Sequence, residues 1–311
     1  MSARPLYLSL ILAVLFTLTL QQRAYSHDFG YEMLRAASAA GCPIETLREM
    51  TCGPVCKDLS GYKLHHRFEA NSSASESYSY SMLVNPSARR FVVTFRGTKG
   101  VTQLLQEFLH SKAVSYQLHN ISNAVATEYF YINYVKYVRN DFMARFKNAI
   151  DSHPDFQFYI VGHSLGGAFA SLAVIDIRKS DLIDKNAISL YTYGCPRVGD
   201  SNLAKAISDS VSEIFRITHR RDVVPHLPPC KSDWKGGCLA KEDHGDQHGS
   251  FVFNAYHVGT EIFYDGSDGK SFKVCQGSED PTCSNKYSVF LGSTDDHRSY
   301  LGVSTRCLGI I

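Results

Sequence analysis

The feature that most constrains the fold is the segment Gly162-His163-Ser164-Leu165-Gly166-Gly167, which stands between an apolar strand and a helix of small residues. It fits the pattern G-x-S-x-G, in which a serine occupies a tight turn from a strand into a helix. Glycines suit such a turn because side chains there would collide with the neighbouring strand or helix. The turn lifts the serine hydroxyl out of the sheet and aims backbone N–H groups at a reacting carbonyl, so we predict that Ser164 is a nucleophile.

Strands and helices alternate on both sides of this turn. The predicted strands are 91–95, 156–161, 188–193, 211–218 and 258–264, with the last one at a sheet edge. The predicted helices are 128–150, 165–178 and 202–208, and 72–81 is predicted as a loop or an edge hairpin. This alternation is typical of an α/β fold, with a mostly parallel central sheet and helices on both of its faces.

The first residues have the composition of an export signal. Arg4 gives a positive start, residues 6–20 are mostly apolar, and Ala24 and Ser26 are small residues of the kind that signal peptidase recognises. We predict a cleaved signal peptide over residues 1–26 and one domain over 27–311, outside the cell or in the lumen of the secretory pathway. The apolar run is shorter than the roughly 20 residues of a membrane span, and we expect no transmembrane segment elsewhere.

Composition supports one large exported domain. Of the 311 residues 44% are hydrophobic, which is enough for one sizeable core, and a formal net charge of +2 with interspersed signs argues against a nucleic-acid binder. Most of the nine cysteines stand in polar loops, as expected for disulfides, whereas Cys195 ends a strand and is predicted to be a buried thiol. Cys52 and Cys56 lack a second matching pair, so we expect no metal site. Asn71 and Asn120 begin glycosylation sequons.

An acid and a base should follow the serine along the chain. Asp222 ends a predicted strand, where parallel sheets build such sites, and is preferred over Asp200, which suits a capping role. The later histidines available as the base are His226, His244, His248, His257 and His297. Spacing favours His297, in a loop near Cys307, with His257 as the alternative.

Together these motifs resemble, in order, those of the class 3, or fungal-lipase-like, lipases. The matching segments are Phe95-Arg96-Gly97-Thr98, Gly162 to Gly167, Gly194 to Gly199, Arg221 to Pro229 and Asp296 to Tyr300. The resemblance spans roughly residues 89–307. It implies an α/β-hydrolase fold and a triad of Ser164, Asp222 and His297. It also implies an oxyanion hole at Thr98 and Leu165.

The same resemblance implies a set of disulfides. It pairs Cys42 with Cys307, Cys52 with Cys56, and Cys275 with Cys283, and the pair that remains is Cys230 with Cys238. The segment after the oxyanion loop corresponds to the lid helix of family lipases. Its apolar residues recur at helical spacing, which predicts an amphipathic helix that is either mobile or fixed. These residues are Val101, Leu104, Leu105, Phe108 and Leu109.

The function implied is that of a serine hydrolase that needs no cofactor. Its expected substrate is a lipid ester, triacylglycerol first, met at an oil–water or membrane interface. A phospholipase A1 or another carboxylesterase would use the same triad. The alternative of a different class is a non-catalytic lipid-binding protein, which the presence of all three triad residues disfavours.

Overall fold

The computed structural model describes residues 24–73, 76–98, 112–230, 238 and 254–307. The main sheet has eight strands in the order β1-β2-β3-β6-β7-β9-β11-β12. Their bounds are β1 Lys63–Asn71, β2 Ser77–Asn85, β3 Arg90–Phe95, β6 Gln157–His163, β7 Ile188–Tyr193, β9 Glu213–His219, β11 Thr260–Tyr264 and β12 Lys273–Val274. Strands β3, β6, β7, β9 and β11 are parallel, and β1, β2 and β12 run antiparallel to their neighbours. The predicted fold class is therefore confirmed.

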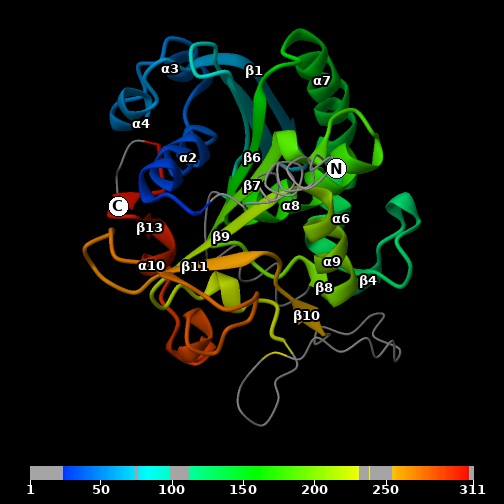
Figure 1. The fold of residues 1–311 in the computed structure, drawn as a ribbon, viewed down its shortest axis with the longest axis vertical. Helices are drawn as coiled ribbons and strands as arrows, with labels where there is room; N and C mark the ends of the chain where they lie inside the picture. The colour runs from blue at the N-terminus through cyan, green and yellow to red at the C-terminus, as the bar shows by residue number, and fades with distance from the viewer. Residues whose placement is uncertain (1–23, 74–75, 99–111, 231–237, 239–253, 308–311) are drawn as a thin grey trace, which may run out of the picture.

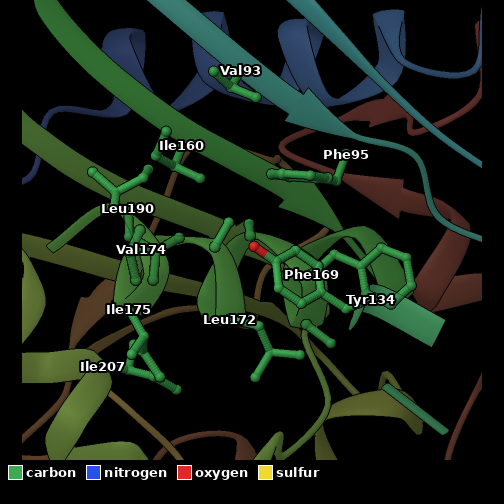
Figure 2. Packing of buried hydrophobic residues seen from close by; sticks show 14 of the residues in the cluster. Val93, Phe95, Tyr134, Ile160, Phe169, Leu172, Val174, Ile175, Leu190 and Ile207 are labelled. Carbon is green, nitrogen blue, oxygen red and sulfur yellow. The ribbon is translucent and has the colours of Figure 1, made fainter. Parts of the chain in front are cut away.

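Helices cover both faces of this sheet (Figure 1). One face carries α2 His27–Ala39, α3 Ile44–Arg48 and α4 Pro54–Asp58, and the other carries α6 Glu128–Asn133, α7 Arg139–Ser152, α8 Leu165–Lys179 and α9 Ser201–Ser210. Alternate residues of each strand enter the two cores. In β6, Phe158 and Ile160 pack against the α8 side, whereas Tyr159 and Val161 pack against the α2 side. In Figure 2, Ile160 and Leu190 lie against Val174 of α8.

Two predicted elements differ in detail. The helix predicted over 128–150 is divided into α6, a π-helical segment Tyr134–Val138 and α7. The strand predicted at an edge, β11, is not at the edge, because the two-residue strand β12 pairs with its outer side. The stretch 72–81, predicted as a loop or an edge hairpin, follows β1 and includes the first five residues of β2, which pairs antiparallel with β1.

The remaining elements are short. A second sheet has the order β10-β8-β5-β4, with β10 Ala255–Tyr256, β8 Gly199–Asp200, β5 Val125–Thr127 and β4 Ala113–Ser115. The 3-10 segments are η1 Leu118–Asn120, η3 Lys185–Ala187, η4 Val224–His226, η5 Ser284–Lys286 and η6 Val289–Leu291. The chain then forms α10 Thr294–Arg298 and the hairpin of β13 Ser299–Tyr300 with β14 Val303–Ser304.

Four disulfides tie these elements together. They are Cys42–Cys307, Cys52–Cys56, Cys230–Cys238 and Cys275–Cys283, the same pairs as those implied by the resemblance. The first of them joins the turn between α2 and α3 to the chain beyond β14, so it closes the domain across a separation of 265 residues. Cys195 is a free, buried thiol.

The last two residues of the predicted signal peptide belong to the packed structure. The ring of Tyr25 packs edge-on against Phe215, with centroids 5.4 Å apart, and its hydroxyl lies 3.0 Å from that of Tyr264. Ser26 is the N-cap of α2, and its side chain accepts a hydrogen bond from the amide of Phe29. A cleavage site after Ser26 would remove both sets of contacts.

These contacts predict that a chain beginning at Ala24 is more stable than one beginning at His27. Losing the N-cap and the aromatic contacts should cost about 2 kcal/mol, which lowers Tm by about 3 °C in a domain of this size. Thermal denaturation of the two proteins measures the difference. Equal melting temperatures would mean that Tyr25 and Ser26 contribute nothing to the fold.

Candidate active site

Ser164 lies at the turn from β6 into α8, at the carboxyl edge of the parallel strands. Its backbone has φ 59° and ψ −130°, a conformation that non-glycine residues rarely adopt and that is often found at functional sites. A Cβ added to Gly162 would lie 2.1 Å from the carbonyl oxygen of Gly166, and one added to Gly166 would lie 2.1 Å from that of Phe95. Only glycine allows the strand, the helix and β3 to approach so closely.

Asp222 and His297 form a buried hydrogen-bonded pair. Nδ1 of His297 lies 2.8 Å from Oδ2 and 3.0 Å from Oδ1 of Asp222, and both side chains are 1% exposed. The hydroxyl of Tyr300 donates to Oδ2, and the amide of Val224 donates to Oδ1 at 2.9 Å. Burial alone would raise the pKa of Asp222, but the His297 ring and these hydrogen bonds outweigh it and lower the pKa. The carboxylate is therefore held ionised against the imidazole.

The two loops that carry this pair are joined to each other. Asp222 follows β9, and a parallel bridge connects it to Ser293, the N-cap of α10, in which His297 lies. The amide of Ser293 donates to the carbonyl oxygen of Arg221 at 2.6 Å, and the amide of Arg221 donates to Oδ2 of Asp296 at 3.2 Å. The acid and the base are thus held by one network of backbone hydrogen bonds.

Ser164 and His297 line the same cavity, which has a volume of about 570 Å³. Nε2 of His297 is buried and has no hydrogen-bond partner among the described residues, so the hydroxyl of Ser164 is not bonded to it in this structure. In free enzymes such catalytic hydrogen bonds are often long and tighten only when substrate binds. The arrangement has a paired acid and base beside a hydroxyl in one cavity, which suits nucleophilic acyl transfer.

The other acid and base candidates have structural partners elsewhere. Asp200 caps α9, accepting from the amide of Leu203 at 2.9 Å, as expected from the sequence. Nε2 of His257 lies 2.7 Å from the carbonyl oxygen of Pro225, and burial lowers its pKa well below the usual range. Burial also lowers the pKa of His226, to about 4. His244 and His248 lie outside the described residues.

Known proteins are similar to this chain in sequence and in fold. Residues 92–232 match the family model of the class 3 lipases. A lipase of Caenorhabditis elegans is 33% identical over 241 residues, which are 73% of this chain and 66% of that protein. The lipase of Rhizomucor miehei is 28% identical over 221 residues, 70% of this chain and 54% of that protein. The crystal structure of a lipase from Rhizopus microsporus var. chinensis superposes with a TM-score of 0.74 and 25% identity, over 92% of this chain and 91% of that one.

The chain belongs to the class 3 lipase family. It spans 66% of the length of the Caenorhabditis elegans lipase and about half of the lengths of the Rhizomucor miehei and Rhizopus niveus lipases. The family resemblance implies that Thr98 and Leu165 form the oxyanion hole of this family member. Leu165 is the first residue of α8, where backbone N–H groups lack a partner within the helix.

Thr98 lines the cavity with Ser164, and its hydroxyl is buried without a partner among the described residues. The preceding residue contacts the nucleophile turn, since a Cβ on Gly97 would lie 3.3 Å from Cβ of Ser164. A free buried donor beside the serine suits the binding of a developing oxyanion. The predicted lid residues Val101, Leu104, Leu105, Phe108 and Leu109 lie outside the described residues.

Two further side chains brace the His297 imidazole and its acid in this family member. The ring of His163 packs against that of His297 with centroids 4.5 Å apart and the planes tilted by 33°, and its Nε2 lies 2.9 Å from the His297 carbonyl oxygen. These contacts give His163 a packing role beside the base. The Tyr300 hydroxyl that donates to Asp222 had no predicted role, although Tyr300 ends the motif that contains His297. In the sequence, its position three residues after His297 is the signal that could have pointed to it.

His163 should make the fold sensitive to acid. Its burial, and then the neighbouring charge of His297, lower its pKa from 6.5 to about 3. Because the folded pKa lies below the unfolded one, the unfolded chain binds more protons between these values. The stabilisation is fully present above pH 6.5 and is lost as the pH falls toward 3.

We therefore expect His163→Gln to reduce the pH dependence of the free energy of unfolding near pH 5. When the unfolded and folded states differ by one bound proton fewer, the slope of the free energy of unfolding against pH is smaller by about 1.4 kcal/mol per pH unit. Urea denaturation between pH 4 and 7 measures this slope. An identical slope in both proteins would contradict a neutral His163 in the folded state.

Ligands for a metal ion are scarce in the described part of the chain. The two groups whose ligand atoms lie close enough to share an ion are Cys42, Cys52 and Cys307, and Cys275, Asp280 and Cys283. All five of these cysteines are in disulfides, so they offer no thiolate. Burial raises the pKa of the free Cys195 thiol to about 12, which keeps it protonated.

Proposed function

We propose that this chain is an exported serine hydrolase that cleaves carboxylic ester bonds of lipids, with triacylglycerol as its main substrate. The observation that carries the proposal is the buried Asp222–His297 pair, whose histidine lines the same cavity as Ser164. Family membership supports it, since both curated relatives described above are named lipases. Among the described residues no helix combines the length and the apolar character needed to cross a membrane.

The reaction has two halves. His297 Nε2 takes the proton of the Ser164 hydroxyl while Oγ attacks the ester carbonyl carbon, and His297 then returns the proton to the departing alcohol. Water, deprotonated by His297, then attacks the carbonyl carbon of the acyl-enzyme, and the acid leaves as His297 returns the proton to Oγ of Ser164. Asp222 holds the imidazole tautomer and stabilises its protonated form, and no cofactor takes part.

Thr98 is proposed to bind the oxyanion of both tetrahedral intermediates, with the amide of Leu165. Thr98→Val keeps the shape of the side chain and removes its hydroxyl, so kcat on a soluble ester should fall about 10²-fold. Thr98→Ser restores the hydroxyl and is the matched control, expected to keep most of the activity. An unchanged kcat in Thr98→Val would show that the Thr98 hydroxyl does not bind the oxyanion.

Substrate class is tested by comparing rates on triacylglycerol emulsion, phospholipid vesicles and a short soluble ester with the same preparation. The proposal expects triacylglycerol to be hydrolysed fastest. Faster release of fatty acid from the phospholipid would instead make the protein a phospholipase A1. Hydrolysis of the soluble ester alone would make it a carboxylesterase of another kind. Export is tested by recovering the processed protein, with any glycans at Asn71 and Asn120, from the medium of expressing cells.

A further inference from the structure

Among the described residues, the two most exposed large apolar side chains are neighbours in the chain. Phe290 is 93% exposed and Leu291 is 65% exposed, and both lie in η6. Water disfavours this exposure, since burying either side chain would stabilise the system. We call this pair the apolar tip.

A rigid base holds the apolar tip in place. The amide of Leu291 donates to the carbonyl oxygen of Ser288 at 3.0 Å, and the amide of Gly292 donates to that of Val289 at 3.1 Å. Before the tip, the hydroxyl of Tyr287 donates to Asp265 at 2.7 Å, and Tyr287 packs against the core cluster that contains the Cys275–Cys283 disulfide. These contacts hold the backbone of the tip and the residues before it, and they leave both apolar side chains exposed.

The chain places the tip at the same edge of the sheet as the nucleophile. Directly after it, Gly292 is so close to Val223 that an added Cβ would lie 2.7 Å from the Val223 side chain. The next residue, Ser293, bridges to Asp222. Asp222 follows the carboxyl end of β9, and Ser164 follows that of β6, and these strands run parallel in one sheet.

We propose that the apolar tip inserts into the surface of the lipid that carries the ester, and so anchors the protein with its cavity at that surface. Two side chains are far too few for a stable protein interface, which takes about 20–30 residues on each side. Two inserted apolar side chains are enough to strengthen adsorption to hydrocarbon. This inference rests on the proposed function, because that function identifies the surface as an ester-carrying lipid. It concerns Phe290 and Leu291 and does not involve the residues predicted to form the lid helix.

The test compares Phe290→Ser/Leu291→Ser with the wild type in two assays. The first is flotation with sonicated phosphatidylcholine vesicles, where the variant should show a partition coefficient lower by about tenfold or more. The second is kcat/KM on a short soluble ester, which should stay unchanged because neither residue lines the cavity. Val274→Ser is the matched control. Val274 is 55% exposed, but it pairs with Ile262 in the middle of β11 and so does not lie at the carboxyl edge of the sheet. Its replacement should therefore alter neither assay.

A second variant keeps the proposal testable if the double substitution impairs folding. Phe290→Trp places a fluorophore at the tip, and brominated phosphatidylcholine vesicles should quench its added emission relative to the wild type. Unchanged flotation of the double variant, or the absence of this quenching, would overturn the proposal. If the proposed hydrolase function were wrong, the result would be different. The wild type would then fail to hydrolyse the soluble ester, whether or not the protein binds to vesicles.

Discussion

Ser164→Ala is expected to lower kcat on a soluble ester by about 10⁴- to 10⁶-fold. Alanine lacks the hydroxyl that forms the acyl-enzyme, and the remaining oxyanion donors and the cavity supply only a residual rate. The substitution should leave the fold intact, since serine and alanine tolerate the positive φ at position 164 about equally and glycines provide the room around the turn. Initial rates measured by release of a chromogenic alcohol test the loss.

Thermal denaturation of the same variant is the control, and its Tm should match that of the wild type. Retention of more than about one hundredth of the wild-type kcat would show that another group attacks the ester. Ser171, which lies in α8 and donates to the carbonyl oxygen of Gly167, is a control serine. Ser171→Ala removes a hydroxyl near the same turn and should leave kcat close to the wild-type value.

Asp222→Asn is expected to lower kcat by about 10⁴-fold. An amide offers an N–H group to Nδ1 of His297 and favours the wrong imidazole tautomer, and it no longer stabilises the charged ring. The lowered pKa of Asp222 means that the native carboxylate is ionised throughout the pH range of the assay. The loss should therefore persist from neutral to alkaline pH, which a kcat profile across this range measures.

Tyr300→Phe is the matched control for Asp222→Asn. It removes one donor to the same carboxylate and leaves its charge and its bond to His297, so a much smaller loss of kcat is expected. If Asp222→Asn and Tyr300→Phe were equally mild, the acid would not be orienting the base.

Much of this arrangement could be predicted because its parts have local signatures. The turn at Ser164 combines an apolar strand, close-packed glycines and a small-residue helix, and the structure contains each of these. Asp200 was predicted to cap a helix from its loop position, and it caps α9. The parallel direction of the central strands followed from the alternation of strands and helices.

Other parts depend on contacts that no local pattern contains. The outer position of β12 arises from two residues that pair with β11. The bond from Tyr300 to Asp222 joins residues far apart in the chain. Residues 25 and 26 looked like the end of a signal peptide because peptidase sites are recognised by small residues, yet Ser26 is also a good helix cap. The π-helical segment 134–138 has no pattern in the sequence that we recognise.

The central claim is that the hydroxyl of Ser164 is activated by His297. Treatment with a fluorophosphonate, followed by mass spectrometry of the digested protein, tests it most directly. The account predicts one adduct per molecule, on the peptide that contains Ser164, and a labelling rate that falls sharply in His297→Ala. Labelling at a different serine, or labelling of Ser164 at the same rate in His297→Ala, would contradict it.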